Sequence, residues 1–316
     1  MPDSPAIEIV DLRKRFRGVE AVRGISLRVE RGEFFGLLGP NGAGKSTTLG
    51  ILTGLVRRDS GRADVLGLDV ERDYRVVRRR IGLAPQELNF DRFLTIEDVL
   101  MYQGGYFGLD RRRAKQRAGE LLEEFGLSAK RRETIRSLSG GMKRRLLIAK
   151  ALVHEPEIII LDEPTAGVDV ELRHQLWSTL RELNRQGTTV LLTTHYIEEA
   201  EALCERVAII DHGEIVATDS PRSLIAQEGT GAIEITFEEP IDDVPPPLCD
   251  WSPLIDGRRL TLHVKDPGRR IGETMAVLQA TSRTIQDVSM RQANLEDVFI
   301  HLTGHTIDGK ASDGPS

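Results

Sequence analysis

The chain has 316 residues, of which 40% are hydrophobic and 29% are charged, and its formal net charge is −6. This is an ordinary globular balance, consistent with one large domain or two unequal domains. A negative net charge argues against a surface that coats nucleic acid, which is usually basic, so we expect no nucleic-acid partner.

Two further absences in the sequence bear on the compartment. Cys204 and Cys249 are too few for a disulfide framework in a chain of this size, which indicates a reducing cytosol. The first five residues lack the basic start and apolar core of a signal peptide. No apolar run approaches the roughly 18 residues that a membrane-spanning helix needs. If the protein serves a membrane process, we expect another chain to supply the membrane part.

Strand patterns dominate the first forty residues. Residues 7–10 and 25–29 alternate or are β-branched, which predicts strands, and residues 34–38 form a short apolar run. A glycine-rich loop follows, and residues 46–55 have a helical pattern that ends near Gly54. A strand, a glycine loop and a helix in this order are the context in which a phosphate-binding loop is credible.

The middle of the chain changes character and then returns to strands. From about residue 88 to 156 the pattern is mostly helical. Residues 158–161 and 189–192 are continuous apolar runs, as expected of strands buried on both faces. The helical stretches between strands predict a parallel sheet, and residues 207–216 predict a closing hairpin.

The pattern resets near residue 221. Residues 232–237, 260–264 and 284–290 resemble strands, and residues 271–278 and 295–302 resemble helices, which predicts a small α+β domain. We therefore divide the chain into a domain over 1–222 with a helical part over about 88–157, an accessory domain over 223–304, and a flexible tail over 305–316.

Three basic runs also occur in helical-looking stretches with acids nearby. Such runs are most often solvated helix faces, and contact with an anionic partner or membrane surface is the alternative. The runs are Arg78-Arg79-Arg80, Arg111-Arg112-Arg113 and Lys143-Arg144-Arg145.

The glycine loop matches the full G-x-x-x-x-G-K-[ST] pattern, in which backbone N–H groups and a helix N-terminus bind phosphate oxygens. Lys45 would neutralise the β- and γ-phosphates of a nucleotide, and Ser46 would bind Mg²⁺. The expected nucleotide-binding residues of this loop are Gly39, Pro40, Asn41, Gly42, Ala43, Gly44, Lys45, Ser46 and Thr47.

Two acidic residues end the apolar run at 158–161. The end of a parallel strand faces the ligand crevice of an open sheet. Asp162 would hold Mg²⁺, and Glu163 would act as the general base for the attacking water. Capping acids before Pro164 would be the alternative interpretation of this pair.

Further motifs accompany these two. Leu138-Ser139-Gly140-Gly141-Met142 resembles the signature of ATP-binding cassette (ABC) ATPases, Thr165 to Asp169 the D-loop, Gln86 the Q-loop glutamine and His195 the switch histidine. Their order fits this family from about residue 8 to 221. The resemblance implies an α/β fold: a P-loop NTPase cassette with an antiparallel β subdomain and a helical subdomain, followed by the small α+β domain.

The resemblance also implies roles. Gln86 would sense Mg²⁺ and the lytic water, His195 would contact the γ-phosphate, and Asp169 would cross a dimer interface. Phe16 would stack on adenine, with simple packing as the alternative. Ser139, Gly140 and Gly141 would face the γ-phosphate held by the P-loop of a second cassette. The expected cofactors are ATP and Mg²⁺. The expected assembly is a homodimer of cassettes, with a close heterodimer as the alternative.

Softer matches concern the branch of the family. The run from Gly140 to Arg145 resembles bacterial ATPases that serve separate ABC-two-type membrane subunits, including daunorubicin-resistance and nodulation-factor exporters; residues 84–90 resemble the YadG-type branch. Met142 departs from the commoner glutamine of the signature. The resemblance implies an exporter ATPase, peripheral on the inner face of the cell membrane, with a separate permease that docks near Glu87, Phe90 and Tyr102.

The C-terminal motif of that branch gives one more expectation. Leu295, Val298, Phe299 and Leu302 are spaced for one helix face, which favours docking within the small domain or a dimer partner over contact with a transported substrate.

Alternatives remain open at this point. A soluble ABC ATPase acting on ribosomes or DNA usually fuses two cassettes or inserts long coiled coils, and neither is present. An importer ATPase often carries a different C-terminal domain and a glutamine in its signature. A P-loop kinase or GTPase would leave residues 138–142 and His195 unexplained.

Overall fold

The structure, a computed structural model, describes residues 4–251, 253–281 and 283–307. It divides into two compact units, and the division falls between Thr218 and Asp219 in the sequence. Most of the expected tail over 305–316 lies outside the described residues. Within those residues, every helix is too short or too polar to cross a membrane.

The larger unit contains an antiparallel sheet of the order β2-β1-β4-β5. Its strands are β1 (Ile7–Phe16), β2 (Val19–Val29), β4 (Ser60–Val65) and β5 (Leu68–Asp69). The first two are longer than the alternating segments predicted, because charged residues continue the hairpin beyond the apolar stretch. Ile7, Ile9 and Leu12 on β1 point into the core and are at most 1% exposed.

A second sheet has six strands in the order β10-β9-β3-β8-β7-β6. They are β3 (Phe34–Leu38), β6 (Ile81–Ala84), β7 (Ile158–Asp162), β8 (Thr189–Thr194), β9 (Arg206–Asp211) and β10 (Glu214–Asp219). The pairs β3–β8, β3–β9, β6–β7 and β7–β8 are parallel. Every residue of β3 and β8 is buried, which confirms the strands predicted from continuous apolar runs.

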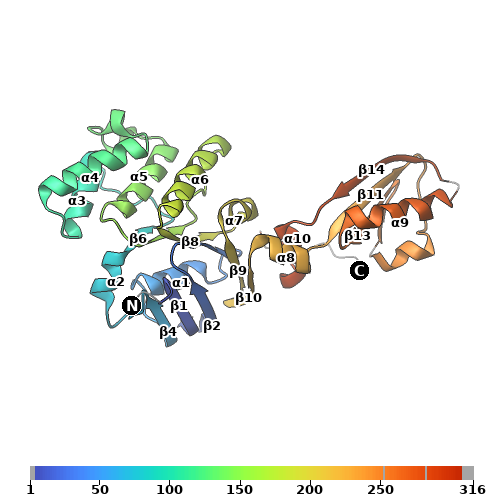
Figure 1. Cartoon of the computed structure of the whole chain (residues 1–316), viewed down its shortest axis with the longest axis horizontal. Coiled ribbons are helices and arrows are strands. Elements are labelled where there is room, and N and C mark those ends of the chain that lie inside the picture. The colour runs from blue at the N-terminus through green and yellow to red at the C-terminus, as the bar shows by residue number, and fades with distance from the viewer. Residues whose placement is uncertain (1–3, 252, 282, 308–316) are drawn as a thin grey trace. The chain divides into compact units, whose positions relative to one another are not determined.

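Helices α1 (Lys45–Leu52), α2 (Tyr74–Arg80), α6 (Val170–Arg185) and α7 (Ile197–Leu203) connect or flank these strands. Helices α3 (Ile96–Tyr106), α4 (Arg111–Glu124) and α5 (Gly140–Leu152) form a separate cluster at the end of this unit opposite to β1, β2 and β4 (Figure 1). The three helices start at side-chain caps, namely Thr95, Asp110 and Ser139, each of which accepts a hydrogen bond from the backbone N–H three residues later.

The smaller unit is an antiparallel sheet of the order β12-β13-β11-β14 with helices beside it. Its elements are α8 (Pro221–Glu228), β11 (Gly231–Phe237), the short helix η3 (Pro246–Trp251), β12 (Pro253–Asp256), β13 (Arg259–Val264), α9 (Pro267–Gln279), β14 (Ile285–Arg291) and α10 (Leu295–Thr303). Alternate residues of β11 and β13 pack into a core with Leu278 of α9.

Helix α10 carries the C-terminal motif. Asn294 and Asp297 form a reciprocal capping box at its start, and Arg291 donates two hydrogen bonds to the same aspartate. Leu295, Val298 and Phe299 have no exposed surface. Leu302, the fourth residue of the predicted face, is half-buried. Three of the four residues are therefore fully buried within the chain.

The two cysteines have opposite environments. Cys204 follows α7 and packs beside Gly36 so closely that a Cβ at Gly36 would lie 2.7 Å from its sulfur. Burial raises the pKa of the Cys204 thiol well above its ordinary value. Cys249 is exposed.

Candidate functional site

The P-loop lies between β3 and α1. A Cβ at Gly39 would come within 2.1 Å of the Ile210 carbonyl oxygen, and Gly44 has φ of +107° at the start of α1. Only glycine fits both positions without strain. The loop can therefore turn tightly and present its backbone N–H groups to an anion at the helix N-terminus.

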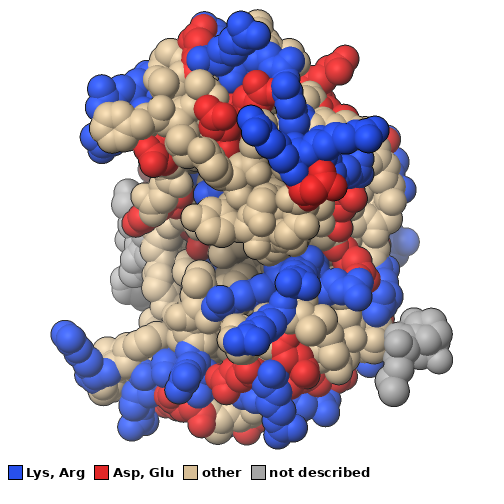
Figure 2. All heavy atoms as spheres, turned by 90° about the vertical axis from the view of Figure 1, so that its left-hand side faces the viewer, with Lys and Arg blue, Asp and Glu red and all other residues tan. Residues whose placement is uncertain are grey.

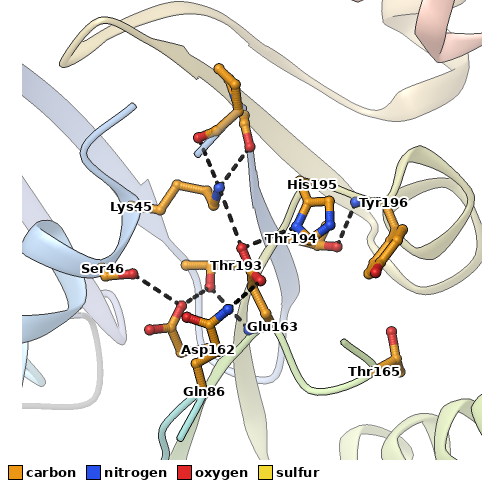
Figure 3. A network of polar contacts seen from close by, with 12 residues as sticks. Lys45, Ser46, Gln86, Asp162, Glu163, Thr165, Thr193, Thr194, His195 and Tyr196 are labelled. Carbon is orange, nitrogen blue, oxygen red and sulfur yellow. Dashed lines mark hydrogen bonds and ion pairs between the residues drawn. The ribbon is translucent and has the colours of Figure 1, made fainter. Parts of the chain in front are cut away.

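Lys45 is the charged residue of this loop, and it is buried, with 4% of its surface exposed. Its Nζ donates to the carbonyl oxygens of Gly39 and Pro40 over 2.6 and 3.0 Å and lies 3.6 Å from Glu163 Oε1 (Figure 3). Burial lowers the pKa of Lys45, and the carboxylates of Glu163 and Asp162 oppose that shift. A buried ammonium held by carbonyl dipoles is well suited to phosphate oxygens.

Ser46 and Asp162 face each other beside the loop. The Ser46 hydroxyl donates to Asp162 Oδ1 over 3.4 Å, and the Thr193 hydroxyl donates to the same oxygen over 2.5 Å. Hydroxyl and carboxylate oxygens are the donors that Mg²⁺ takes from proteins when phosphates complete its shell. The residues present therefore fit this cation.

Glu163 follows β7 and has unusual backbone geometry. Its φ is +49°, in the left-handed region that few residues other than glycine adopt. Its N–H donates to the Thr193 carbonyl oxygen over 3.0 Å, and 5% of the residue is exposed. The neighbouring strand β8 thus holds this turn.

Three side chains from different segments converge on the Glu163 carboxylate (Figure 3). The Gln86 amide donates to Oε2 over 2.8 Å, while His195 Nδ1 and Lys45 Nζ lie 3.1 and 3.6 Å from Oε1. The histidine contact is a close approach without the angle of a hydrogen bond. The structure thus places the predicted residues Lys45, Ser46, Gln86, Asp162, Glu163 and His195 in one network.

A cleft of about 370 Å³ opens beside this network. Phe16, at the end of β1, is not among its lining residues; it is 45% exposed and lies under the Lys14 ammonium, 5.1 Å from the ring centre. The lining residues are Ala21, Asn41, Gly42, Gly44, Lys45, Ser46, Thr47, Gln86 and Glu163.

The second glycine segment lies apart from that cleft. Ser139 caps α5, and its hydroxyl accepts from the Met142 N–H over 3.3 Å. Ser139 and Gly140 are exposed, whereas a Cβ at Gly141 would lie 1.6 Å from a Leu172 methyl carbon of α6. The segment therefore combines an exposed helix N-terminus with a tight contact behind it.

The segment from Thr165 to Asp169 is fixed at both ends. Asp169 is exposed and caps α6 by accepting from the Leu172 N–H over 3.0 Å. Thr165 Oγ1 donates to Glu199 Oε1 over 2.9 Å, and Trp177 Nε1 donates to the same oxygen over 3.3 Å. Glu199 has no exposed surface, and this burial raises the pKa of its carboxyl group.

Sequence reasoning missed Thr193, Glu199 and Arg144. Thr193 could have been found from its place two residues before His195, at the end of an apolar run. Arg144 was predicted to lie on a solvated helix face, and that is wrong: it is 5% exposed and donates to the Gln86 and Glu163 carbonyl oxygens. A basic run carries no signal of which member turns inward, because only packing of α5 against the sheet decides it.

Known proteins resemble the chain over nearly its whole length. A family model described as ABC transporter matches residues 22–166. The Nod factor export ATP-binding protein I of Paraburkholderia xenovorans is 41% identical, covering 96% of this chain and 98% of that protein. The daunorubicin resistance ATP-binding protein DrrA2 of Streptomyces coeruleorubidus is 41% identical over 96% of each chain. The linearmycin resistance ATP-binding protein LnrL of Bacillus subtilis is 37% identical over 95% and 99%.

Solved structures are similar over about two thirds of the chain. The ATP-binding subunit of an ABC transporter superposes with a TM-score of 0.65 at 29% identity, covering 70% of this chain and 92% of that one. A dimeric ATP-binding cassette in a post-hydrolysis state, bound to ADP and phosphate, gives a TM-score of 0.63 at 26% identity over 68% and 98%.

Proposed function

This chain belongs to the family of ABC transporter ATP-binding proteins, and from that premise we propose that it hydrolyses ATP to drive export through a separate membrane-spanning subunit. The observation that carries the ATPase assignment is the convergence of Lys45, Gln86 and His195 on Glu163 beside the P-loop. Export rests on the relatives, whose names describe export and resistance ATP-binding proteins.

The P-loop holds the nucleotide. Its backbone N–H groups and the N-terminus of α1 receive the phosphates, and Lys45 exchanges the loop carbonyls for phosphate oxygens. Ser46 and Asp162 would hold Mg²⁺, with Gln86 beside them. When bound there, this cation supplies positive charge that neutralises the phosphates. Phe16 would stack on the adenine ring.

Hydrolysis requires a water activated for attack on the γ-phosphate. Glu163 accepts its proton, and a positioned base of this kind contributes about 100- to 10,000-fold to the rate. Gln86 orients the carboxylate through its amide hydrogen bond, and His195 Nδ1 lies 3.1 Å from the other carboxylate oxygen. From there His195 would contact the γ-phosphate. The left-handed backbone at Glu163 contributes to the direction of the base, in addition to the side-chain rotamer.

The second glycine segment would complete the site of another copy. Ser139 and Gly140 form an exposed helix N-terminus that lies outside the P-loop cleft of its own chain. Such an end binds anions. We infer that it contacts the γ-phosphate held by a partner cassette, so that ATP joins two copies and hydrolysis releases them. The related cassette bound to ADP and phosphate is dimeric.

A separate surface suits the membrane partner. A cleft of about 380 Å³ lies between α2, α3 and α5 and is lined largely by apolar groups, and a neighbouring cleft of about 420 Å³ includes Phe90 and Tyr102. Phe93 and Tyr106 are 85% and 88% exposed nearby. Exposed aromatic side chains beside an apolar cleft mark an interaction site. The occupant that we propose is a helix of the permease; Glu87, also a predicted contact, accepts from Asn89.

The charge of this surface constrains that helix. Arg78, Lys150, Arg92, Arg136 and Lys143 line these clefts and a third one beside them, and Asp91 is the one carboxylate among the lining residues. In the part of the chain that the structure describes, none of the five cations forms an ion pair. Figure 2 shows Lys and Arg side chains, with Asp and Glu side chains among them, on both sides of an uncharged band on the face that carries α2 and α3. An acidic, partly apolar helix would complement it.

Such docking would hold the protein peripherally on the inner face of the cell membrane. The test is co-purification of the full chain with the membrane protein encoded beside its gene. Replacing Phe93 and Tyr106 by serine should abolish co-purification, whereas Val216→Ser, at an exposed position of β10, should preserve it. Recovery of ribosomes instead of a membrane protein would favour the soluble alternative.

A further inference from the structure

Arg144 connects three segments of the larger unit. It lies in the second turn of α5, and its guanidinium donates from Nη1 to Gln86 O over 3.0 Å and to Pro85 O over 3.4 Å. Its Nη2 donates to Glu163 O over 2.7 Å. All three acceptors are backbone carbonyls, so Arg144 binds the main chain at two of the segments that carry the reaction.

These contacts close a ring. Arg144 holds the main chain of Gln86, the Gln86 amide holds the Glu163 carboxylate, and the Glu163 carbonyl returns to Arg144. The ring joins the helix that begins with the second glycine segment, the loop after β6 and the turn after β7. No covalent path shorter than 19 residues links any two of its members.

The left-handed backbone conformation of Glu163 has to be stabilised by its surroundings. A non-glycine residue in a sparsely populated backbone region costs about 1–3 kcal/mol and persists only when its surroundings fix it. The N–H of Glu163 is fixed by Thr193 on β8 and its carbonyl by Arg144 on α5. Thr193 and Arg144 therefore hold the peptide groups before and after the Glu163 Cα.

Arg144 is also a buried cation. It is 5% exposed, and among the described residues it has no carboxylate within ion-pair distance. Burial lowers its pKa, while the nearby charges of Glu199, Glu163 and Asp162 raise it. Burying a guanidinium costs free energy unless hydrogen bonds compensate. A buried cation that donates only to backbone carbonyls therefore contributes more to the position of the main chain than to the free energy of unfolding.

We propose that Arg144 is a positioning residue for hydrolysis: it sets the main chain of Gln86 and Glu163 so that the amide meets the carboxylate, and it ties both to α5. The proposal rests on the proposed roles of Glu163 and Gln86. Arginine suits this task because its planar fork reaches two carbonyls in fixed directions, which a lysine ammonium cannot do.

The test compares steady-state ATP hydrolysis by the full chain and its variants. Arg144→Gln should lower kcat about 10- to 100-fold, as expected for the loss of charge-assisted hydrogen bonds that hold a base. KM for ATP should change less than about threefold, because the P-loop contacts of Lys45 remain. Arg144→Lys should recover part of kcat, since a lysine can still donate to one carbonyl.

Arg145→Gln is the matched control. Arg145 lies next on α5 and donates to the Phe125 carbonyl oxygen over 2.9 Å, rather than to Gln86 or Glu163. The control should keep kcat within about threefold of the wild type while losing a comparable hydrogen bond. Thermal unfolding of each variant separates misfolding from mispositioning, and Arg144→Lys serves if Arg144→Gln does not fold.

A double-mutant cycle with Gln86→Ala supplies the decisive readout. If Arg144 acts through Gln86 and Glu163, the combined loss in kcat will be smaller than the product of the single losses. Wild-type kcat in a folded Arg144→Gln chain, or independent multiplicative losses, would overturn the proposal. A wild-type chain without ATPase activity would instead overturn the proposed function.

Discussion

The side-chain amide of Gln86 donates to Glu163 Oε2 over 2.8 Å, although the two residues lie 77 positions apart in the chain. The contact exists because β6 and β7 are adjacent parallel strands and both residues follow the carboxyl ends of their strands. A base that is already hydrogen-bonded and fixed in direction loses less conformational entropy when the transition state forms.

Removing the charge of this base should separate binding from chemistry. Glu163→Gln should bind ATP, lower kcat at least about 100-fold and elute as an ATP-dependent dimer in size-exclusion chromatography. Glu123→Gln, at an exposed position of α4, is the control and should remain active and release its dimer. A fully active Glu163→Gln protein would remove Glu163 as the base.

Substitutions at Gly140 and Gly141 can separate a role in packing from a role in contacting phosphate. Gly141→Ala would place its Cβ 1.6 Å from a Leu172 carbon, whereas Gly140→Ala meets nothing within 4 Å. Thermal unfolding should show that Gly141→Ala destabilises by about 1–3 kcal/mol. Gly140→Ala should keep the unfolding temperature but weaken the ATP-dependent dimer formed in the Glu163→Gln background; an unchanged dimer would exclude close contact at Gly140.

Met142 is the one signature position that departs from the family pattern. Its backbone N–H makes the cap to Ser139, and this contact does not depend on the side chain. Met142→Gln should therefore keep kcat within about tenfold of the wild type, whereas Ser139→Ala should cost the helix about 1 kcal/mol in addition to any lost phosphate contact. A larger loss in Met142→Gln would mean that the thioether is specifically required.

Phe16 offers a test of nucleotide stacking. It is 45% exposed, and base–aromatic stacking is worth about 1–3 kcal/mol. Phe16→Ala should raise KM for ATP about 5- to 150-fold with little change in kcat. Val19→Ala, at a more exposed position in the same hairpin, should leave KM unchanged; equal effects of the two substitutions would favour simple packing.

Glu199 predicts a pH dependence of stability. Burial raises its folded pKa above the ordinary value of 4.5, so the folded state binds this proton more tightly than the unfolded state. The stabilisation is complete below the unfolded pKa and is lost as pH rises through the raised folded pKa. Glu199→Gln keeps an acceptor for Thr165 and Trp177 and removes this loss.

The measurement is thermal unfolding at pH 5 and pH 8. The unfolding temperature of Glu199→Gln relative to the wild type should be higher at pH 8 than at pH 5. An equal difference at both pH values would show that Glu199 keeps the same protonation in the folded and unfolded states.

Local patterns predicted those parts of the fold and site that depend on neighbours in sequence. The strand at Phe34–Leu38 matched its predicted range because its burial on both faces leaves an uninterrupted apolar run. The change of pattern near residue 221 was likewise visible. The network around Glu163 followed from motif order, because parallel strands bring their carboxyl ends together.

Features set by tertiary packing escaped prediction. Ser60–Val65 contains Gly61, Arg62 and Asp64, so its pattern hides the alternation of Ala63 and Val65 that bury against β1. Arg144 and Glu199 lie in polar stretches and look like surface charges. Their burial depends on which helix face meets the sheet, and a run of charged residues carries no record of that choice.

The unequal environments of the two cysteines have a practical use. A thiol-reactive dye added to the native protein would modify the exposed Cys249 and leave the buried Cys204 untouched. The unmodified sequence therefore accepts one fluorophore per chain, located in the smaller unit. A donor and an acceptor on separate copies would report directly whether ATP brings two of these units together.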